Sequence, residues 1–202
     1  MSSRPDALPR AAHRPSTREA MLDAAEAHLG ADGTLSLDSA ARAAGVTKPG
    51  LMYHFSTKEQ LLTAVLERLA ARYEREMAQA VTALVEAAGD TPADRHFTDA
   101  TAPQRFLAYV DWACRASLSP ADLVIFADPK LRVALTERWR EQVDRWLAIP
   151  EDATADQRRR LLAVRLMGDG LWFDRASGLL ETSAQDAETL RALALELLGA
   201  DS

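Results

Sequence analysis

The stretch that most restricts the fold of this chain is LSLDSAARAAGVTKPGLMYHFSTKEQLL, residues 35–62. Its first part is rich in alanine and predicts a thin helix from Leu37 to Ala44, which Gly45 can end in a left-handed conformation. A second short helix is predicted from Lys48 to His54. A helix, a glycine-containing turn and a second helix are typical of the helix-turn-helix, whose second helix enters the major groove of DNA.

The second helix is expected to have a buried face and an outward face. Leu51 and Phe55 are four residues apart and should pack inward. Gly50 allows the backbone to approach a duplex closely, and lysine, tyrosine and histidine side chains can bond phosphates or base edges. The residues predicted to contact DNA, including two expected helix caps and a lysine at the start of the next helix, are Ser36, Thr47, Lys48, Pro49, Gly50, Tyr53, His54 and Lys58.

The segment AAGVTKPGLMYHFSTKEQLL resembles the DNA-binding domain of the TetR/AcrR family of bacterial transcriptional regulators. The similarity extends over roughly residues 17–66. It rests on the combination of the Ala-Gly-Val turn, the Tyr-His-Phe end of the second helix and the Lys-Glu pair that follows. Met52 lies in a helix whose residues vary among members, so the resemblance does not imply which base sequence is bound. The alternative is an ordinary three-helix bundle without a DNA-binding function.

The neighbouring segments are expected to complete a three-helix DNA-binding domain, residues 16–62. A capping box at Ser16–Glu19 predicts the start of its first helix, which Gly30 or Gly33 ends. Residues 1–15 are polar and hold three prolines and an excess of arginine over acidic residues. They are predicted to be a disordered basic arm, which is either a solvated tail or a contact to DNA beside the second helix.

A long helix is predicted from about Thr57 to about Ala88, because overlapping capping boxes precede a continuous apolar stripe. Its N-terminus and Lys58 together form a ready phosphate site. The helix links the first domain to a C-terminal body, residues 63–202. No alternating apolar pattern competes, so the fold class is expected to be all-α. In the body we expect a polar loop at 89–102 and capped helices starting near Thr101 and at 123–127, 130–148, 154–180 and 183–198.

Composition and charge exclude several classes of protein. The net charge is −6, and residues 1–60 are balanced with 7 basic and 7 acidic side chains. A neutral N-terminal part on an acidic body fits a localised DNA face. Cys114 is the only cysteine, no apolar run is long enough for a membrane span, and we therefore expect a cytoplasmic protein without a membrane partner. The four histidines lack the spacing of metal ligands, so neither a metal nor a cofactor is expected.

The segment 161–173, LLAVRLMGDGLWF, is apolar on almost all sides and should be covered on most of them. Gly168 and Gly170 each cost helix propensity of about 1 kcal/mol relative to alanine, which a close approach between helices can offset. The resemblance implies that this helix and the last one form a four-helix bundle across a homodimer; the alternative is an intramolecular core. The residues expected at the dimer interface are Gly168, Leu171, Leu190, Leu193 and Leu197.

The resemblance also implies a small-molecule effector in the C-terminal body. The body supplies aromatic side chains and a charged pair four residues apart in the apolar helix. Each aromatic residue can instead be plain core, and the charged pair can be a structural ion pair. The residues expected to line the effector site are Tyr109, Trp112, Phe126, Trp139, Arg165, Asp169, Trp172 and Phe173.

These observations predict a ligand-responsive dimeric regulator, most often a repressor, which binds double-stranded operator DNA. Two alternatives remain open at this stage. One is a DNA-architectural protein that no effector releases. The other is an enzyme, although the chain contains no nucleophile elbow, phosphate-binding loop, metal-spaced histidine cluster or dinucleotide fingerprint.

Overall fold

The computed structural model describes residues 17–87, 89 and 96–199, and these residues form helices and connecting turns without a strand, which confirms the all-α fold class. The predicted arm at residues 1–15 and the Ser16 cap lie outside the described residues. The elements in chain order are α1 (Thr17–Asp32), α2 (Leu37–Ala43), α3 (Lys48–His54), α4 (Lys58–Ala87), η1 (Phe97–Asp99), α5 (Ala102–Arg115), η2 (Pro120–Phe126), α6 (Arg132–Trp146), α7 (Ala155–Ser177) and α8 (Ala184–Gly199).

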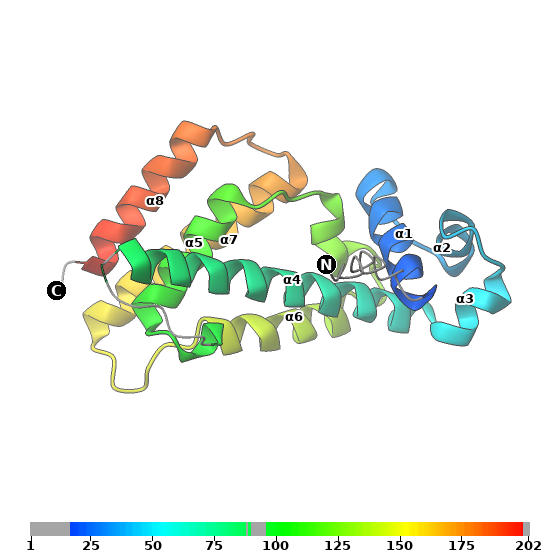
Figure 1. The fold of residues 1–202 in the computed structure, drawn as a ribbon, viewed down its shortest axis with the longest axis horizontal. Helices are drawn as coiled ribbons and strands as arrows, with labels where there is room; N and C mark the ends of the chain where they lie inside the picture. The colour runs from blue at the N-terminus through cyan, green and yellow to red at the C-terminus, as the bar shows by residue number, and fades with distance from the viewer. Residues whose placement is uncertain (1–16, 88, 90–95, 200–202) are drawn as a thin grey trace, which may run out of the picture.

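The first three helices form a head at one end of an elongated molecule (Figure 1). Ser36 caps α2 as predicted, because its hydroxyl accepts a hydrogen bond from the Ser39 amide. Gly45 has φ +66° and makes the left-handed turn after α2. Thr47 caps α3 by accepting a hydrogen bond from the Gly50 amide. Local capping and one glycine turn therefore set the angle between the two helices of the motif.

Helix α4 connects this head to the rest of the molecule (Figure 1). Its 30 residues correspond to a length of about 45 Å at 1.5 Å per residue. Side chains from Leu61 to Met77 are buried along it, against α1 in the head and against η1, α5, η2 and α6 in the body. The proposed domain boundary between residues 62 and 63 falls inside this continuous helix, so α4 belongs to both parts.

The body is built around α5, which packs against α4, α7 and α8. Capping boxes begin α5 at Thr101 and α7 at Thr154, as the sequence predicted. Some details differ from the predictions. The segment before α5 is not only a polar loop, because it contains η1, whose Phe97 side chain is 2% exposed. Helix α7 ends at Ser177 rather than near residue 180, because Gly178 adopts φ +65°.

The short element η2 belongs to the body and lies against the head. It is a 3-10 helix that Ser119 caps, and it packs against α1, α4, α6 and α7. Helix α6 follows it and lies alongside α4 (Figure 1). This helix begins at Arg132, two residues later than predicted, because Asp128 closes a tight turn by accepting a hydrogen bond from the Lys130 amide.

Candidate DNA-binding surface and effector site

Helix α3 presents the outward face that its sequence predicted. Leu51 is fully buried and Phe55 is 2% exposed, so these two side chains fix the helix on the head. On the other side, Tyr53 is 86% exposed and Met52 is 39% exposed. The Tyr53 and His54 rings meet edge to face with centroids 5.0 Å apart. The helix therefore offers a protruding aromatic side chain on a rigid base.

Several of the residues expected to contact DNA already have hydrogen-bond or ion-pair partners within the chain. Ser36 and Thr47 use their hydroxyls as helix caps. Lys48 forms an ion pair with Asp38 of α2, 2.9 Å between Nζ and Oδ2, in which both side chains are largely exposed. Pro49 is exposed and Gly50 is partly buried. Contact of any of these residues with DNA remains a prediction.

Lys58 has a partner that the sequence did not indicate. Its Nζ lies 2.6 Å from Oδ2 of Asp128, which precedes α6 in the body. The two side chains are 31% and 17% exposed, so this ion pair is partly shielded from solvent. The pKa of Asp128 lies below its ordinary value, mainly because the Lys58 ammonium donates a hydrogen bond to the carboxylate. The cation expected to meet a DNA phosphate is thus paired with a carboxylate of the body.

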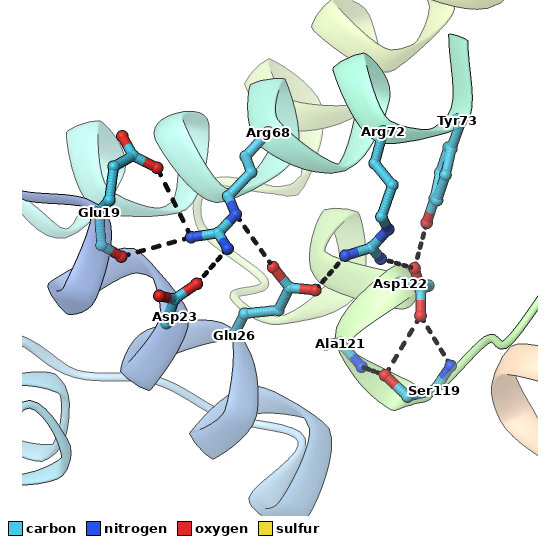
Figure 2. A network of polar contacts seen from close by, with 9 residues as sticks. All are labelled: Glu19, Asp23, Glu26, Arg68, Arg72, Tyr73, Ser119, Ala121 and Asp122. Carbon is cyan, nitrogen blue, oxygen red and sulfur yellow. Dashed lines mark hydrogen bonds and ion pairs between the residues drawn. The ribbon is translucent and has the colours of Figure 1, made fainter. Parts of the chain in front are cut away.

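A chain of ion pairs joins α1, α4 and η2 (Figure 2). Arg68 of α4 contacts Glu19 and Asp23 of α1. One turn later, Arg72 reaches in two directions. Its Nη1 lies 2.5 Å from Oε1 of Glu26 on α1, and its Nη2 lies 3.0 Å from Oδ1 of Asp122 on η2. One guanidinium therefore bridges the DNA-binding head and the body.

Asp122 lies at the η2 end of this network, where several donors converge on its carboxylate (Figure 2). Its side chain is 1% exposed and accepts hydrogen bonds from Arg72, the Tyr73 hydroxyl and the Ser119 amide, the last at 2.7 Å. A buried carboxylate is stable when several donors replace its hydration. Burial and then the Asp122 charge raise the pKa of Tyr73 above its ordinary value, so the phenol stays protonated and keeps donating. Sequence gave no sign of this site, because its parts are about 50 residues apart.

Tyr73 also belongs to a cluster of six aromatic rings in the body. Its ring centroid lies 4.5 Å from that of Trp112 and 6.0 Å from that of Trp139. Trp139 stacks on Trp172 at 5.6 Å and meets Trp146 edge to face at 5.8 Å, while Trp112 stacks on Tyr109 at 5.8 Å. The rings form one continuous set from the inner face of α7 to the polar network at η2.

Four of the eight expected effector residues, Tyr109, Trp112, Trp139 and Trp172, thus come together. The charged pair borders them. The Tyr109 hydroxyl donates to Asp169 at 2.7 Å, and Arg165 lies 3.6 Å from the other oxygen of that carboxylate. Burial, followed by the Asp169 charge, raises the pKa of Tyr109 well above its ordinary value. Phe126 and Phe173 are 50% and 40% exposed and are not among the rings of this cluster.

A separate cavity of about 420 Å³ lies at the end of the body where α5 and α7 begin and α8 ends. Its wall combines the Arg160 and Gln157 side chains with leucines of α7 and α8. None of the eight expected effector residues lines it. The lining residues are Ala102, Pro103, Pro150, Asp152, Ala153, Gln157, Arg160, Leu161, Leu197 and Leu198.

The expected dimer residues fall on different faces. A Cβ atom on Gly168 would lie 2.5 Å from Cε1 of Tyr109 in the same chain, and Leu171 is 2% exposed, so both residues serve the intramolecular core. Leu193 of α8 is 41% exposed, whereas Leu190 and Leu197 are partly buried. Gly170, by contrast, has open space where a Cβ would be. It shares an outward stripe of α7 with three exposed apolar side chains, Leu162, Leu166 and Phe173.

Among the described residues, no cluster of three or more histidine, cysteine, aspartate or glutamate side chains is arranged to hold a metal ion. None of the described helices is long and apolar enough to cross a membrane. Cys114 is half-buried, and its thiol lies 3.2 Å from the Ala187 carbonyl.

Two family models match this chain. Residues 21–65 match the model of bacterial regulatory proteins of the tetR family, and residues 104–199 match the model of the tetracyclin repressor-like C-terminal domain. The two matches carry the same family assignment and together cover more than half of the chain. No curated protein matches the sequence.

Solved structures share the fold over almost the whole chain. A member of the TetR family from Streptomyces coelicolor is 23% identical, with a TM-score of 0.56, and 91% of this chain and 98% of that chain are covered. The multidrug binding protein EbrR in complex with malachite green is 22% identical, with a TM-score of 0.58 and the same coverage of both chains. GusR of Salmonella enterica is 16% identical, with a TM-score of 0.59, covering 94% and 99%.

Proposed function

Because the chain belongs to the TetR family of bacterial transcriptional regulators, we propose that it is a repressor that binds a near-palindromic operator as a homodimer and is released by a small molecule. The family is one of regulators, which gives the enzyme alternative no support. The observation that carries DNA binding is the geometry of α3. A buried Leu51 and Phe55 hold this helix rigidly while Tyr53 projects into solvent, as a helix that enters the major groove requires.

The dimer is supported by the outward stripe of α7. Leu162 and Leu166 are 51% and 59% exposed and lie one turn apart, and Gly170 continues the stripe without a side chain. A monomer rarely leaves such a contiguous apolar stripe on a long helix uncovered. A twofold interface, in which this face meets its own copy, buries the stripe and places two α3 helices for two half-sites. Gly170, rather than Gly168, is the glycine that lies on this face.

The effector site is proposed at the aromatic cluster. Its rings are in mutual contact, so an effector enters by displacing rings rather than by filling an open space. The body offers flat apolar surfaces and buried indole N–H donors, among them that of Trp146, which has no hydrogen-bond partner within the described part of the chain. These features suit an aromatic molecule with an acceptor group. EbrR, which has the same fold, binds malachite green, and an aromatic effector is our proposal for this chain.

The polar network gives such an effector a route to the head. Tyr73 has its ring in the aromatic cluster and its hydroxyl on Asp122. A displaced Tyr73 ring withdraws a donor from Asp122, which also holds Arg72, and Arg72 in turn holds Glu26 of α1. An effector acts through this route only if it binds the DNA-releasing arrangement more tightly than the DNA-binding one.

Selection of bound DNA from a random pool tests the proposal. The wild-type protein should enrich a site with twofold symmetry, and Tyr53→Ala should weaken binding to that site by about 1–3 kcal/mol. Because Tyr53 is 86% exposed, the variant should melt at the wild-type temperature. If no sequence is enriched, the regulator proposal fails. If a site is enriched but no aromatic compound in a broad screen releases the protein from it, the architectural alternative is favoured.

A further inference from the structure

The ion pair between Lys58 and Asp128 differs from the other lysine pair near α3. Lys48 and Asp38 both belong to the head, are 47% and 65% exposed, and move together. Lys58 begins α4, whereas Asp128 lies 70 residues later, between η2 and α6 of the body. Its side chain is 17% exposed, and its Oδ1 is fixed by the Lys130 amide at 2.8 Å. The carboxylate is therefore held in place by the body and directed at a cation of the DNA-binding face.

The Lys58–Asp128 ion pair is relevant to DNA binding because of the position of Lys58. The first turn of a helix favours phosphate, and a lysine there adds a full positive charge. An ammonium has three donors, so a phosphate could bond Lys58 while Asp128 stays in place. The phosphate and the carboxylate would then lie within a few ångströms of one another. This is inside the screening length of about 8 Å at physiological salt, so the two negative charges repel each other with little attenuation.

We propose that Asp128 is an internal competitor of the DNA backbone for Lys58, a carboxylate latch that must open before the operator is bound tightly. This inference rests on the proposed DNA-binding function and adds a means of regulation to it. A body arrangement that keeps Asp128 against Lys58 lowers DNA affinity, and one that withdraws Asp128 frees the cation. The latch thus makes affinity depend on the segment between η2 and α6, to which no DNA contact is assigned.

The test is a double-mutant cycle on the DNA recovered from the random pool, with affinity measured by fluorescence anisotropy at fixed salt. Asp128→Asn keeps the Oδ1 acceptor for the Lys130 amide and removes the charge that faces Lys58. It should tighten binding about two- to fivefold, the range of a partly exposed ion pair. Lys58→Gln should weaken binding. In the Lys58→Gln background, Asp128→Asn should have almost no further effect, because residue 58 then carries no positive charge for the Asp128 carboxylate to pair with.

A control separates the latch from general electrostatics, since removing any negative charge near DNA favours binding. Glu59 is exposed and lies next to Lys58 in the first turn of α4, and it has no ion pair with Lys58. Glu59→Gln should change affinity by the same factor with either residue at position 58. If Asp128→Asn is also additive with Lys58→Gln, or if it does not tighten binding, the latch is overturned although DNA binding stands. Asp128→Ser, which keeps an oxygen that can accept from the Lys130 amide, should repeat the result of Asp128→Asn.

Discussion

Two glycines in α7, two residues apart, should respond to the same substitution in opposite ways. At Gly168, an added Cβ would lie 2.5 Å from Cε1 and 2.6 Å from Cδ1 of Tyr109, closer than Cβ atoms are found to any neighbour. The Tyr109 ring cannot easily withdraw, because it stacks on Trp112 and its hydroxyl is held by Asp169 at 2.7 Å. Because the contact is this close and the ring is held, the overpacking cost should lie in the upper part of the usual range, at about 2–3 kcal/mol. Gly170 has nothing within 4 Å of the same position.

Helix propensity favours alanine at both sites by about 1 kcal/mol, so the two effects oppose each other only at Gly168. We expect Gly168→Ala to lower the free energy of unfolding by about 1–2 kcal/mol and Gly170→Ala to raise it by up to about 1 kcal/mol. The two variants should thus differ by about 1–3 kcal/mol, and at about 2–4 °C per kcal/mol for a chain of this size their melting temperatures should differ by roughly 2–12 °C. Thermal unfolding followed by circular dichroism at matched protein concentration measures this difference.

The Gly168 reasoning is refuted if Gly168→Ala melts at or above the wild-type temperature, because Tyr109 then does not pack against that backbone. The Gly170 result also reports on the proposed dimer. A loss of stability there that grows as the protein is diluted would place Gly170 at a close contact between subunits. A gain in stability at all protein concentrations would mean that Gly170 faces open space in the dimer as well.

Three further changes test other parts of the structure. Tyr73→Phe removes one donor from the buried Asp122 while Arg72 and Ser119 remain, so unfolding free energy should fall by about 1–2 kcal/mol; a loss near zero in chemical denaturation would mean that the hydroxyl is not bonded there. Leu166→Glu adds a charge to the outward stripe of α7 and should shift the protein to monomer in sedimentation velocity without lowering helix content, whereas an unchanged dimer would place the interface on another face. Trp172→Phe keeps an aromatic ring on Trp139 and should reduce effector-induced release from DNA several-fold; undiminished release would place the effector elsewhere, with the cavity beside Arg160 as the next candidate.

Local features of the fold could be predicted from the sequence because their causes are local. The N-cap at Ser36 and the capping boxes at Thr101 and Thr154 act within three residues, and each starts a helix in the structure. The 3.6-residue period likewise identified Leu51 and Phe55 as buried. The α3 surface could be described before the fold was known, since burying one face of a seven-residue helix exposes the other.

The pairings between distant segments could not be predicted, and they decide what the individual residues do. Gly168 and Gly170 have the same sequence context, and only the position of Tyr109 on α5 shows that Gly168 faces the core. From the sequence alone, Lys58 was expected to be an unpaired cation. In the structure, the turn before α6 places Asp128 beside it. Phe97 belongs to a polar segment that was predicted to be a loop. In the structure its ring is buried, and η1 packs against α4. In each case the partner is far away in sequence, where periodicity carries no information.

The arrangement of contacts along α4 suits it to act as a lever between the proposed effector site and DNA. Tyr73, in the aromatic cluster, and Lys58, at the DNA-facing end, are 15 residues apart, which corresponds to about 22 Å of helix. A tilt of about 5° at Tyr73 therefore moves the start of the helix by about 2 Å. The Lys58–Asp128 distance is 2.6 Å, so such a displacement is enough to make or break that ion pair. Under the proposed function, we expect a small movement of the Tyr73 ring to change both the angle of α3 and the charge that the head presents to DNA.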